Sequence, residues 1–141
     1  MGNDYSTALA IATRAHSGQT RKDGEDYINH PRRIAARMWN EYNDIELECI
    51  AIMHDVIEDS AYTIADIKAV GFTNTVVDAL RILTREIGQS YLDYILDIKD
   101  SGSRDAMLVK LADLEDNLNG AKGTLKDKYE MARYILTHYE D

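Results

Sequence analysis

Apolar residues recur at three- and four-residue spacing along most of this chain, which is the pattern of helices that bury one face. Serine, threonine and aspartate stand where such helices would begin, and glycines stand where several would end. No two alternating runs flank a two-residue turn, so β-hairpins are not expected. The pattern predicts helices over residues 7–16, from Pro31 onward, from Asp44 to beyond His54, and over 63–71, 73–85, 90–98, 103–112 and 124–139.

Together with this pattern, the length and composition of the chain predict its fold. The chain has 141 residues, 45% of them hydrophobic, with one proline and eight glycines. This is enough for one hydrophobic core but not for two. We therefore expect a compact all-α fold of about seven to eight helices, with residues 1–141 in a single domain. The lone Cys49 lies in an apolar run, where a buried small hydrophobe is expected rather than a nucleophile.

Charge and hydropathy limit the kinds of molecule that this protein is expected to bind. No segment approaches the apolar length that crosses a bilayer and no secretory signal is visible, so we expect a cytoplasmic protein with no membrane partner. The net charge of −9 argues against a nucleic acid polymer, because phosphate backbones favour basic surfaces. Residues 14–37 nevertheless carry six basic against three acidic side chains, which suits a small phosphorylated ligand or, equally, a solvated helix face. The nine tyrosines are compatible with a homodimer or with filling of the core.

A cluster of ionisable residues follows the apolar run 50–53. His54 and Asp55 stand one helical turn before Glu58 and Asp59, and on a continuous helix Glu58 would lie over His54 and Asp59 over Asp55. Charges beside a core are costly unless a cation or water offsets them. Imidazole with carboxylate is a ligand mixture that suits borderline divalent metals. The competing interpretation, a solvated acidic helix end, places carboxylates at the unfavourable end of the helix dipole.

Two further residues could complete a metal site. His30 precedes Pro31 where a loop leads into a helix, and Asp113 ends an otherwise apolar helical stretch. Each has a simpler interpretation, His30 as a helix cap and Asp113 as a surface acid. Of the other histidines, His16 could border the site, whereas His138 is expected to be exposed.

Four blocks of the sequence, in order, resemble the hydrolase domain of RelA/SpoT proteins. They are AHSGQTRKDG at 15–24, YINHP at 27–31, MHDVIED at 53–59, and KLAD at 110–113 with Asn117. The resemblance covers about residues 8–118 and is strongest to the stand-alone small alarmone hydrolases, a branch of the HD-domain superfamily.

The resemblance implies a role for each matching residue. The implied ligands of one divalent metal, usually manganese, are His30, His54, Asp55 and Asp113. The implied acidic pair that orients or activates the attacking water is Glu58 and Asp59. The implied nucleotide contacts are Arg21, Lys22 and Asn117. The implied reaction is hydrolysis of the 3′-pyrophosphate of (p)ppGpp, which releases pyrophosphate and GDP or GTP.

One segment departs from the family pattern. After the metal-binding aspartate the family commonly has Arg-Leu-His-Asn, whereas this chain has Leu114-Glu115-Asp116-Asn117. An HD phosphohydrolase for another nucleotide, such as NADPH or a nucleoside monophosphate, is therefore an alternative. A non-catalytic nucleotide-binding regulatory module is a second. A purely structural helical domain is a third, but it leaves the cluster from His54 to Asp59 unexplained.

Overall fold

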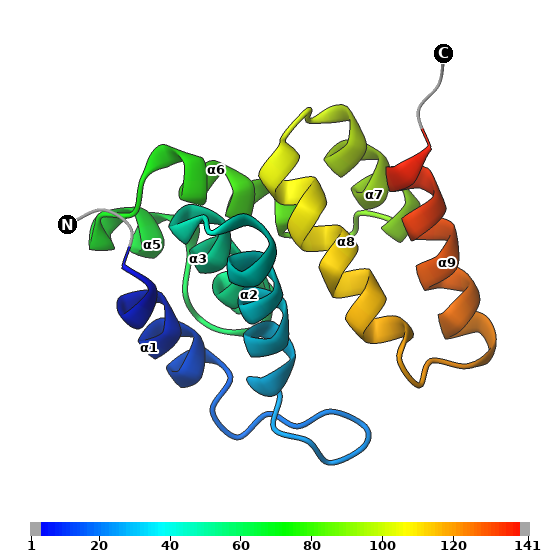
Figure 1. Cartoon of the computed structure of the whole chain (residues 1–141), viewed down its shortest axis with the longest axis horizontal. Helices are drawn as coiled ribbons and strands as arrows, with labels where there is room; N and C mark the ends of the chain where they lie inside the picture. Colours follow the sequence, from blue (N-terminus) through cyan, green and yellow to red (C-terminus); the bar gives the residue numbers. More distant parts are fainter. Residues whose placement is uncertain (1–3, 139–141) are drawn as a thin grey trace.

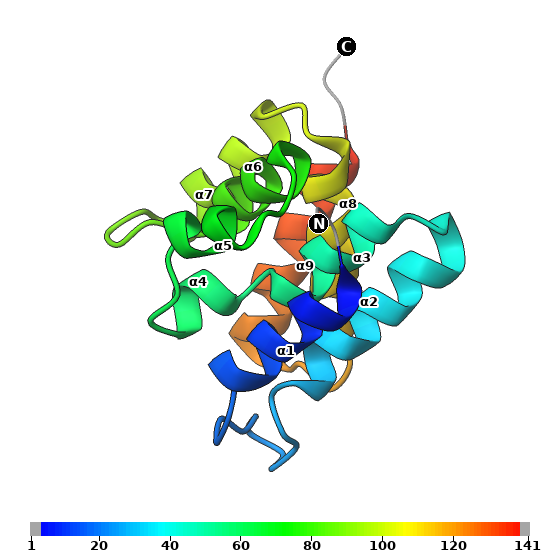
Figure 2. The same ribbon diagram turned by 90° about the vertical axis from the view of Figure 1, so that its left-hand side faces the viewer.

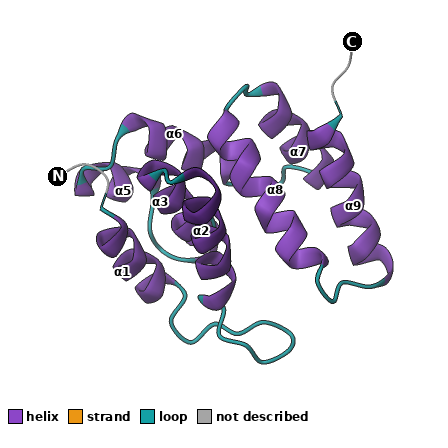
Figure 3. Ribbon diagram, in the orientation of Figure 1, coloured by secondary structure: helices purple, strands orange, loops and turns teal. Residues whose placement is uncertain are grey.

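The computed structural model describes residues 4–138, and within that range it is all-α, with nine helices and no strand (Figures 1 and 3). The helices are α1 (Tyr5–Ala15), α2 (Asn29–Tyr42), α3 (Ile45–Met53), α4 (Val56–Asp59), α5 (Ile64–Val70), α6 (Asn74–Leu83), α7 (Tyr91–Asp100), α8 (Arg104–Leu118) and α9 (Gly123–Thr137). All eight predicted helices are present, and the four-residue α4 is the addition. Tyr139, the last residue of the predicted terminal helix, lies outside the described residues.

Local capping chemistry explains where several helices begin. The side chains of Asp44, Ser90 and Ser103 each accept a hydrogen bond from a backbone N–H in the first turn of α3, α7 and α8 respectively. Thr63 and Asp66 form a reciprocal capping box at the start of α5. These interactions are local, so the helix starts could be predicted from the sequence.

Helix α3 lies in the middle of the fold and packs against α1, α2, α6 and α8. Helices α7, α8 and α9 gather at one end of the molecule in Figure 1, and Figure 2 shows α1 at the opposite side, facing the viewer. Helix α2 packs against α3 and α8. The largest fully buried side chains come from six helices: Ile34, Met38, Leu47, Ile50, Ile52, Met53, Ile67, Leu80, Leu83, Ile95, Ile98 and Leu114. Cys49 is also buried, and burial raises the pKa of its thiol to about 12, as expected for an unreactive core residue.

The prediction of one helix running through His54 to Asp59 is wrong. Helix α3 ends at Met53, and His54 with Asp55 forms a turn before α4 begins. Asp55 has φ −105° and ψ 0°, outside the helical region. Adjacent side chains on a continuous helix point about 100° apart, so the break is what lets both residues face one centre.

No helix in the described part of the chain is long and apolar enough to span a membrane.

Leu80 offers a test of this core. It is fully buried on α6, so Leu80→Ala should lower the free energy of unfolding by about 2–5 kcal/mol. Leu92, which is 45% exposed on α7, is the matched control, and its alanine variant should change stability by less than about 0.5 kcal/mol. Urea denaturation of both variants gives the comparison, and equal losses would contradict this packing.

Candidate functional site

The four residues predicted as metal ligands converge on one point. His30 comes from the first turn of α2, His54 and Asp55 from the turn between α3 and α4, and Asp113 from α8. Each offers one ligand atom, and these atoms all lie within 4.8 Å of one another. His30, His54 and Asp113 are buried and Asp55 is partly buried. The simpler interpretations of His30 as a cap and Asp113 as a surface acid are therefore wrong.

Asp113 lies at the centre of this group. Its Oδ1 is 2.7 Å from Nε2 of His30 and 3.3 Å from Nε2 of His54. Nε2 of His54 also lies 3.0 Å from Oδ2 of Asp55, and the hydroxyl of Tyr27 donates to the same Asp55 oxygen at 2.5 Å. Nε2 of His30 thus faces one carboxylate, and Nε2 of His54 faces two.

The outward nitrogens of both histidines have acceptor partners. Nδ1 of His54 donates to the carbonyl oxygen of Ala51 at 2.7 Å, and Nδ1 of His30 lies 2.6 Å from Oδ2 of Asp116. A histidine that binds a metal through Nε2 usually donates its other N–H to a carbonyl or carboxylate in this way. The donor set of two imidazoles and two carboxylates therefore fits a divalent transition metal.

The charges around the centre balance one another. Burial opposes ionisation, but Lys110 and His54 hold the pKa of Asp113 well below its usual value, and His54 lowers that of Asp55 to about 2. Burial would lower the pKa of His54, yet the Asp55 and Asp113 carboxylates raise it well above its usual value. The carboxylates and His54 thus stabilise one another's charged forms. A divalent cation bound here would compete with a proton on His54, because a metal ligand must be deprotonated.

Lys110 is a residue to which sequence reasoning gave no role. Its side chain is 10% exposed, and its ammonium group lies 2.8 Å from Oδ2 of Asp113, one turn along α8. The same group lies 5.1 Å from the centre of the Tyr94 ring. A lysine in the apolar stretch of α8 was a signal of a buried ion pair, since lysine is almost never fully buried without a partner.

A cavity of about 170 Å³ opens beside the ligand cluster. Three cationic side chains line it, Arg85 from the loop after α6, Lys110 from α8 and Lys128 from α9. Lys128 lies 4.1 Å from the centre of the Tyr91 ring. The hydroxyl of Tyr91 is buried and has no hydrogen-bond partner among residues 4–138. The carboxylates of Asp55, Glu58 and Asp113 line it as well, so the cavity would suit a multiply charged anion once a divalent cation is bound by Asp55 and Asp113.

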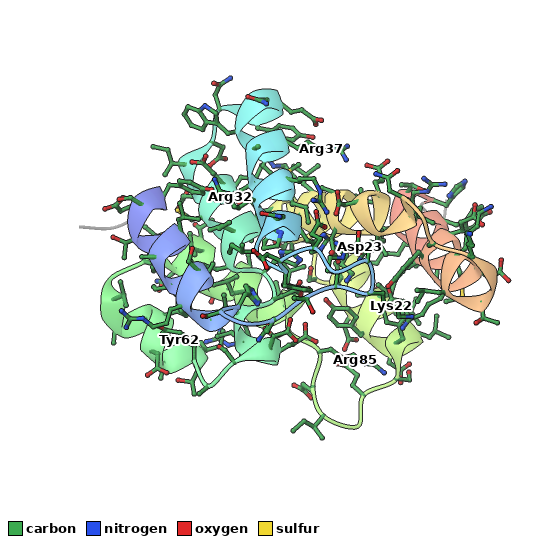
Figure 4. All side chains as sticks on the ribbon, turned by 90° about the horizontal axis from the view of Figure 1, so that it is seen from below. Lys22, Asp23, Arg32, Arg37, Tyr62 and Arg85 are labelled. Carbon is green, nitrogen blue, oxygen red and sulfur yellow. The ribbon has the colours of Figure 1, made fainter. Side chains whose placement is uncertain are left out.

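The predicted nucleotide-contact residues line a second, adjoining cavity of about 480 Å³. Arg21 and Lys22 come from the loop ahead of α2, and Asn117 comes from α8. A guanidinium N–H of Arg21 donates to Oδ1 of Asn117 at 2.8 Å. Tyr27, Asn117 and Tyr129 line both cavities, so the two adjoin at these side chains. Figure 4 shows Lys22 and Asp23 on the loop ahead of α2, and Arg85 on the loop after α6.

Of the predicted acidic pair Glu58 and Asp59, only Glu58 lines the smaller cavity. Glu58 lines the smaller cavity together with Asp55, and one of its oxygens accepts a hydrogen bond from the backbone N–H of Arg85 at 3.2 Å. Burial and then the Asp55 carboxylate raise the pKa of Glu58 to about 7. Asp59 is not among the residues that line this cavity. Burial raises its pKa as well, and its backbone carbonyl accepts from Gln19 at 2.9 Å.

Some basic side chains of segment 14–37 form ion pairs within the protein, and others line a cavity. Arg33 pairs with Glu25 and Asp116, and Arg37 pairs with Glu41 and Glu115. These two arginines therefore join elements of the protein, and Arg21 and Lys22 are the members that face the larger cavity.

Two further predictions concern the remaining histidines, and both are confirmed. His16 is buried, and its ring centre lies 4.8 Å from that of Tyr27, so it borders the ligand cluster. His138 is exposed and stacks on Tyr134.

No family model matches this chain, but curated proteins do. It is 33% identical over 130 residues to a guanosine-3′,5′-bis(diphosphate) 3′-pyrophosphohydrolase of Haemophilus influenzae, a match that covers 84% of this chain and 19% of that protein. A protein of the same name from Vibrio cholerae is 32% identical over 148 residues, covering 94% and 20%. The bifunctional (p)ppGpp synthase/hydrolase SpoT of Escherichia coli K12 is 43% identical over 61 residues, covering 43% and 9%. The chain thus spans a fifth or less of each relative.

A solved structure shares the fold. It is described as a metazoan ortholog of SpoT that hydrolyses ppGpp and plays a role in starvation responses, and it matches with a TM-score of 0.76. The match has 23% sequence identity and covers 94% of this chain and 82% of that one. The prediction of a compact all-α fold is therefore confirmed.

Proposed function

This chain is related in sequence and fold to the RelA/SpoT hydrolase domain, and from that premise we propose that it is a metal-dependent (p)ppGpp 3′-pyrophosphohydrolase. One observation carries the proposal above all. The four candidate ligands His30, His54, Asp55 and Asp113 converge beside a cavity lined with cationic side chains. A metal centre next to a cavity with cationic side chains is an arrangement that can hydrolyse a phosphate ester, because the metal activates water and offsets phosphate charge.

The metal in this proposal is a single manganese ion. Its ligands would be Nε2 of both histidines and one oxygen of each aspartate, a mixed nitrogen and oxygen set that manganese accepts. Bound there, the ion would lower the pKa of a water molecule and offset negative charge on the phosphate. Tyr27, which donates to Asp55, would keep that carboxylate oriented toward the centre.

Glu58 is the proposed general base. It lines the cavity with Asp55, and its pKa near 7 suits a group that must take up a proton at neutral pH. Water oxygen would bond to the phosphorus attached to the ribose 3′ oxygen, and the bond from that oxygen to phosphorus would break. The water proton would pass to Glu58, and the 3′ oxygen would leave as a hydroxyl by taking up that proton, so that Glu58 is ionised again at the end. Asp59 follows Glu58 on α4 and would help to place it.

The two cavities divide the substrate between them in this proposal. The larger one would hold the nucleoside and its 5′-phosphates against Arg21, Lys22 and Asn117. The smaller one would hold the 3′-pyrophosphate against Arg85 and Lys128, with the Tyr91 hydroxyl as a further donor. A small nucleotide substrate agrees with a cytoplasmic location and with the expectation that no nucleic acid polymer or membrane takes part. A homodimer and a single domain over residues 1–141 stay predictions.

The test is pyrophosphate release from ppGpp by protein stripped of metal and then supplied with manganese. We expect release that needs added manganese and is lost again on chelation. Asp55→Ala should bind no manganese and release no pyrophosphate, because one of four ligands is gone. NADPH and nucleoside monophosphates are tested in parallel. Turnover of one of these alone would replace (p)ppGpp by that nucleotide, and metal binding without any turnover would favour a binding module.

A further inference from the structure

Asp116 lies on the far side of His30 from the other candidate ligands. Its Oδ2 is 2.6 Å from Nδ1 of His30, whereas Nε2 of the same ring faces Asp113 at 2.7 Å. The side chain of Asp116 is 13% exposed. It is the residue that stands where the related family commonly has histidine, so the contact belongs to a segment in which this chain departs from the family.

The contact fixes which nitrogen of His30 carries a hydrogen outward. Both oxygens of Asp116 accept hydrogen bonds from Arg33, so this carboxylate acts as an acceptor. Nδ1 of His30 is therefore the donor in the 2.6 Å hydrogen bond to Asp116. The ring is then held with Nε2 pointing at Asp113, which is the orientation a metal ligand needs.

Arg33 holds the carboxylate of Asp116 in place. Its Nε lies 2.8 Å from Oδ1 and its Nη2 2.9 Å from Oδ2, so it binds the carboxylate through both oxygens. Arg33 is itself anchored by Glu25 at 2.8 and 3.0 Å.

The same carboxylate also reaches Arg21, a proposed substrate contact. Nη1 of Arg21 lies 3.4 Å from Oδ2 of Asp116, while Nη2 donates to Asn117. Oδ2 of Asp116 is thus shared by the ring of His30 and the guanidinium groups of Arg33 and Arg21. It links the candidate metal centre to the nucleotide cavity, as does Asn117, which accepts from Arg21 and donates to Oδ1 of Asp113 at 3.3 Å.

We propose that Asp116 is a positioning residue that orients His30 for metal binding and holds Arg21 at the nucleotide cavity. Arg33 is its counter-ion. The first half of the proposal concerns the metal alone, whereas the second half rests on the proposed function, because it needs a nucleotide as substrate. The residue that departs from the family pattern, Asp116, thus has a function in the site.

The test measures manganese affinity on metal-stripped protein, by electron paramagnetic resonance of the free ion. Asp116→Asn should weaken binding by about 10- to 100-fold, the usual loss when the partner of a ligating histidine is removed. Glu115→Gln is the matched control, because Glu115 neighbours Asp116 on α8 but pairs with the exposed Arg37. Its affinity should equal that of the wild type. Unchanged affinity in folded Asp116→Asn protein would overturn the proposal.

A second variant covers the case in which Asp116→Asn does not fold. Arg33→Gln keeps Asp116 but removes its bidentate partner, and it should also weaken manganese binding, by a smaller factor. Nitrogen NMR of the wild type adds a readout that a merely structural role would not move. His30 should carry its outward hydrogen on Nδ1, and a ring found with a bare Nδ1 would overturn the proposal.

The role of Asp116 at His30 and its role at Arg21 can be contradicted independently of each other. If Asp116→Asn loses manganese affinity but no variant hydrolyses ppGpp, the proposed function fails and the role at His30 stands. If ppGpp is hydrolysed and Asp116→Asn, saturated with manganese, keeps the wild-type KM, the contact with Arg21 has no part in substrate binding. A raised KM at saturating manganese supports that second half.

Discussion

Replacing Asp113 by asparagine is expected to abolish manganese binding and to lower kcat by about a thousand-fold or more. Asp113 faces both histidines and Lys110, and the variant keeps its shape but loses its negative charge. A catalytic metal contributes several kcal/mol to the transition state, and about 4 kcal/mol corresponds to a thousand-fold in rate. Assays of manganese affinity and of pyrophosphate release from ppGpp measure both effects.

The same substitution should also destabilise the metal-free protein. It leaves the ammonium group of Lys110 buried without its carboxylate, and breaking one partner of a buried ion pair costs about 3–5 kcal/mol. The double variant Lys110→Met with Asp113→Asn should recover much of that stability but none of the metal binding. Asp100→Asn, at the exposed end of α7, is the control for charge alone. Wild-type manganese affinity in folded Asp113→Asn protein would remove Asp113 from the ligand set.

The helices could be predicted because the interactions that start and stop them are local. Asp44 and Ser90 bind N–H groups within three residues of themselves, and Thr63 pairs with Asp66 one turn along. The apolar spacing of each segment is likewise contained in a few turns. Nothing beyond the segment itself is needed to predict these elements.

The break between α3 and α4 could not be predicted in the same way. The run from Ile50 to Ile57 is apolar except for His54 and Asp55, and its spacing is compatible with one helix. The turn is supported by partners that come from elsewhere in the chain. Asp113 is 59 residues away from His54, and Tyr27 is 28 residues away from Asp55. Contacts of this range are set by the packing of α2, α3 and α8.

The ligand set was predictable, whereas the cations around it were not. Spacing and resemblance both pointed to the region of His54, and the structure brings all four candidate ligands together. Arg85, Lys110 and Lys128 come from three separate elements, and no short motif relates them. The sequence marked Asp116 only as a departure from a pattern, because its contact with His30 spans 86 residues.

Glu58→Gln is expected to lower kcat by about a hundred- to ten-thousand-fold, the usual contribution of a general base, and to leave manganese bound. Glutamine keeps the size and a hydrogen-bond acceptor but cannot take up a proton from water. Glu58 lines the cavity and Asp59 does not, so Asp59→Asn should have the smaller effect. Glu130→Gln, on an exposed position of α9, is the control, and its kcat should equal that of the wild type.

The pH dependence of kcat shows whether Glu58→Gln acts by removing a proton acceptor or by disturbing the geometry of the cavity. Glu58 acts as a base only when ionised, and its pKa is about 7 without metal, so wild-type kcat should rise with pH through a midpoint at or below 7. The glutamine variant should lack that rise. A raised folded-state pKa also means that the stability contributed by the protonated carboxyl is lost as pH rises toward 7. Metal-free wild-type protein should therefore lose stability relative to Glu58→Gln between about pH 5 and pH 8, as urea denaturation would measure. A wild-type pH profile retained in the variant would assign the base to another residue.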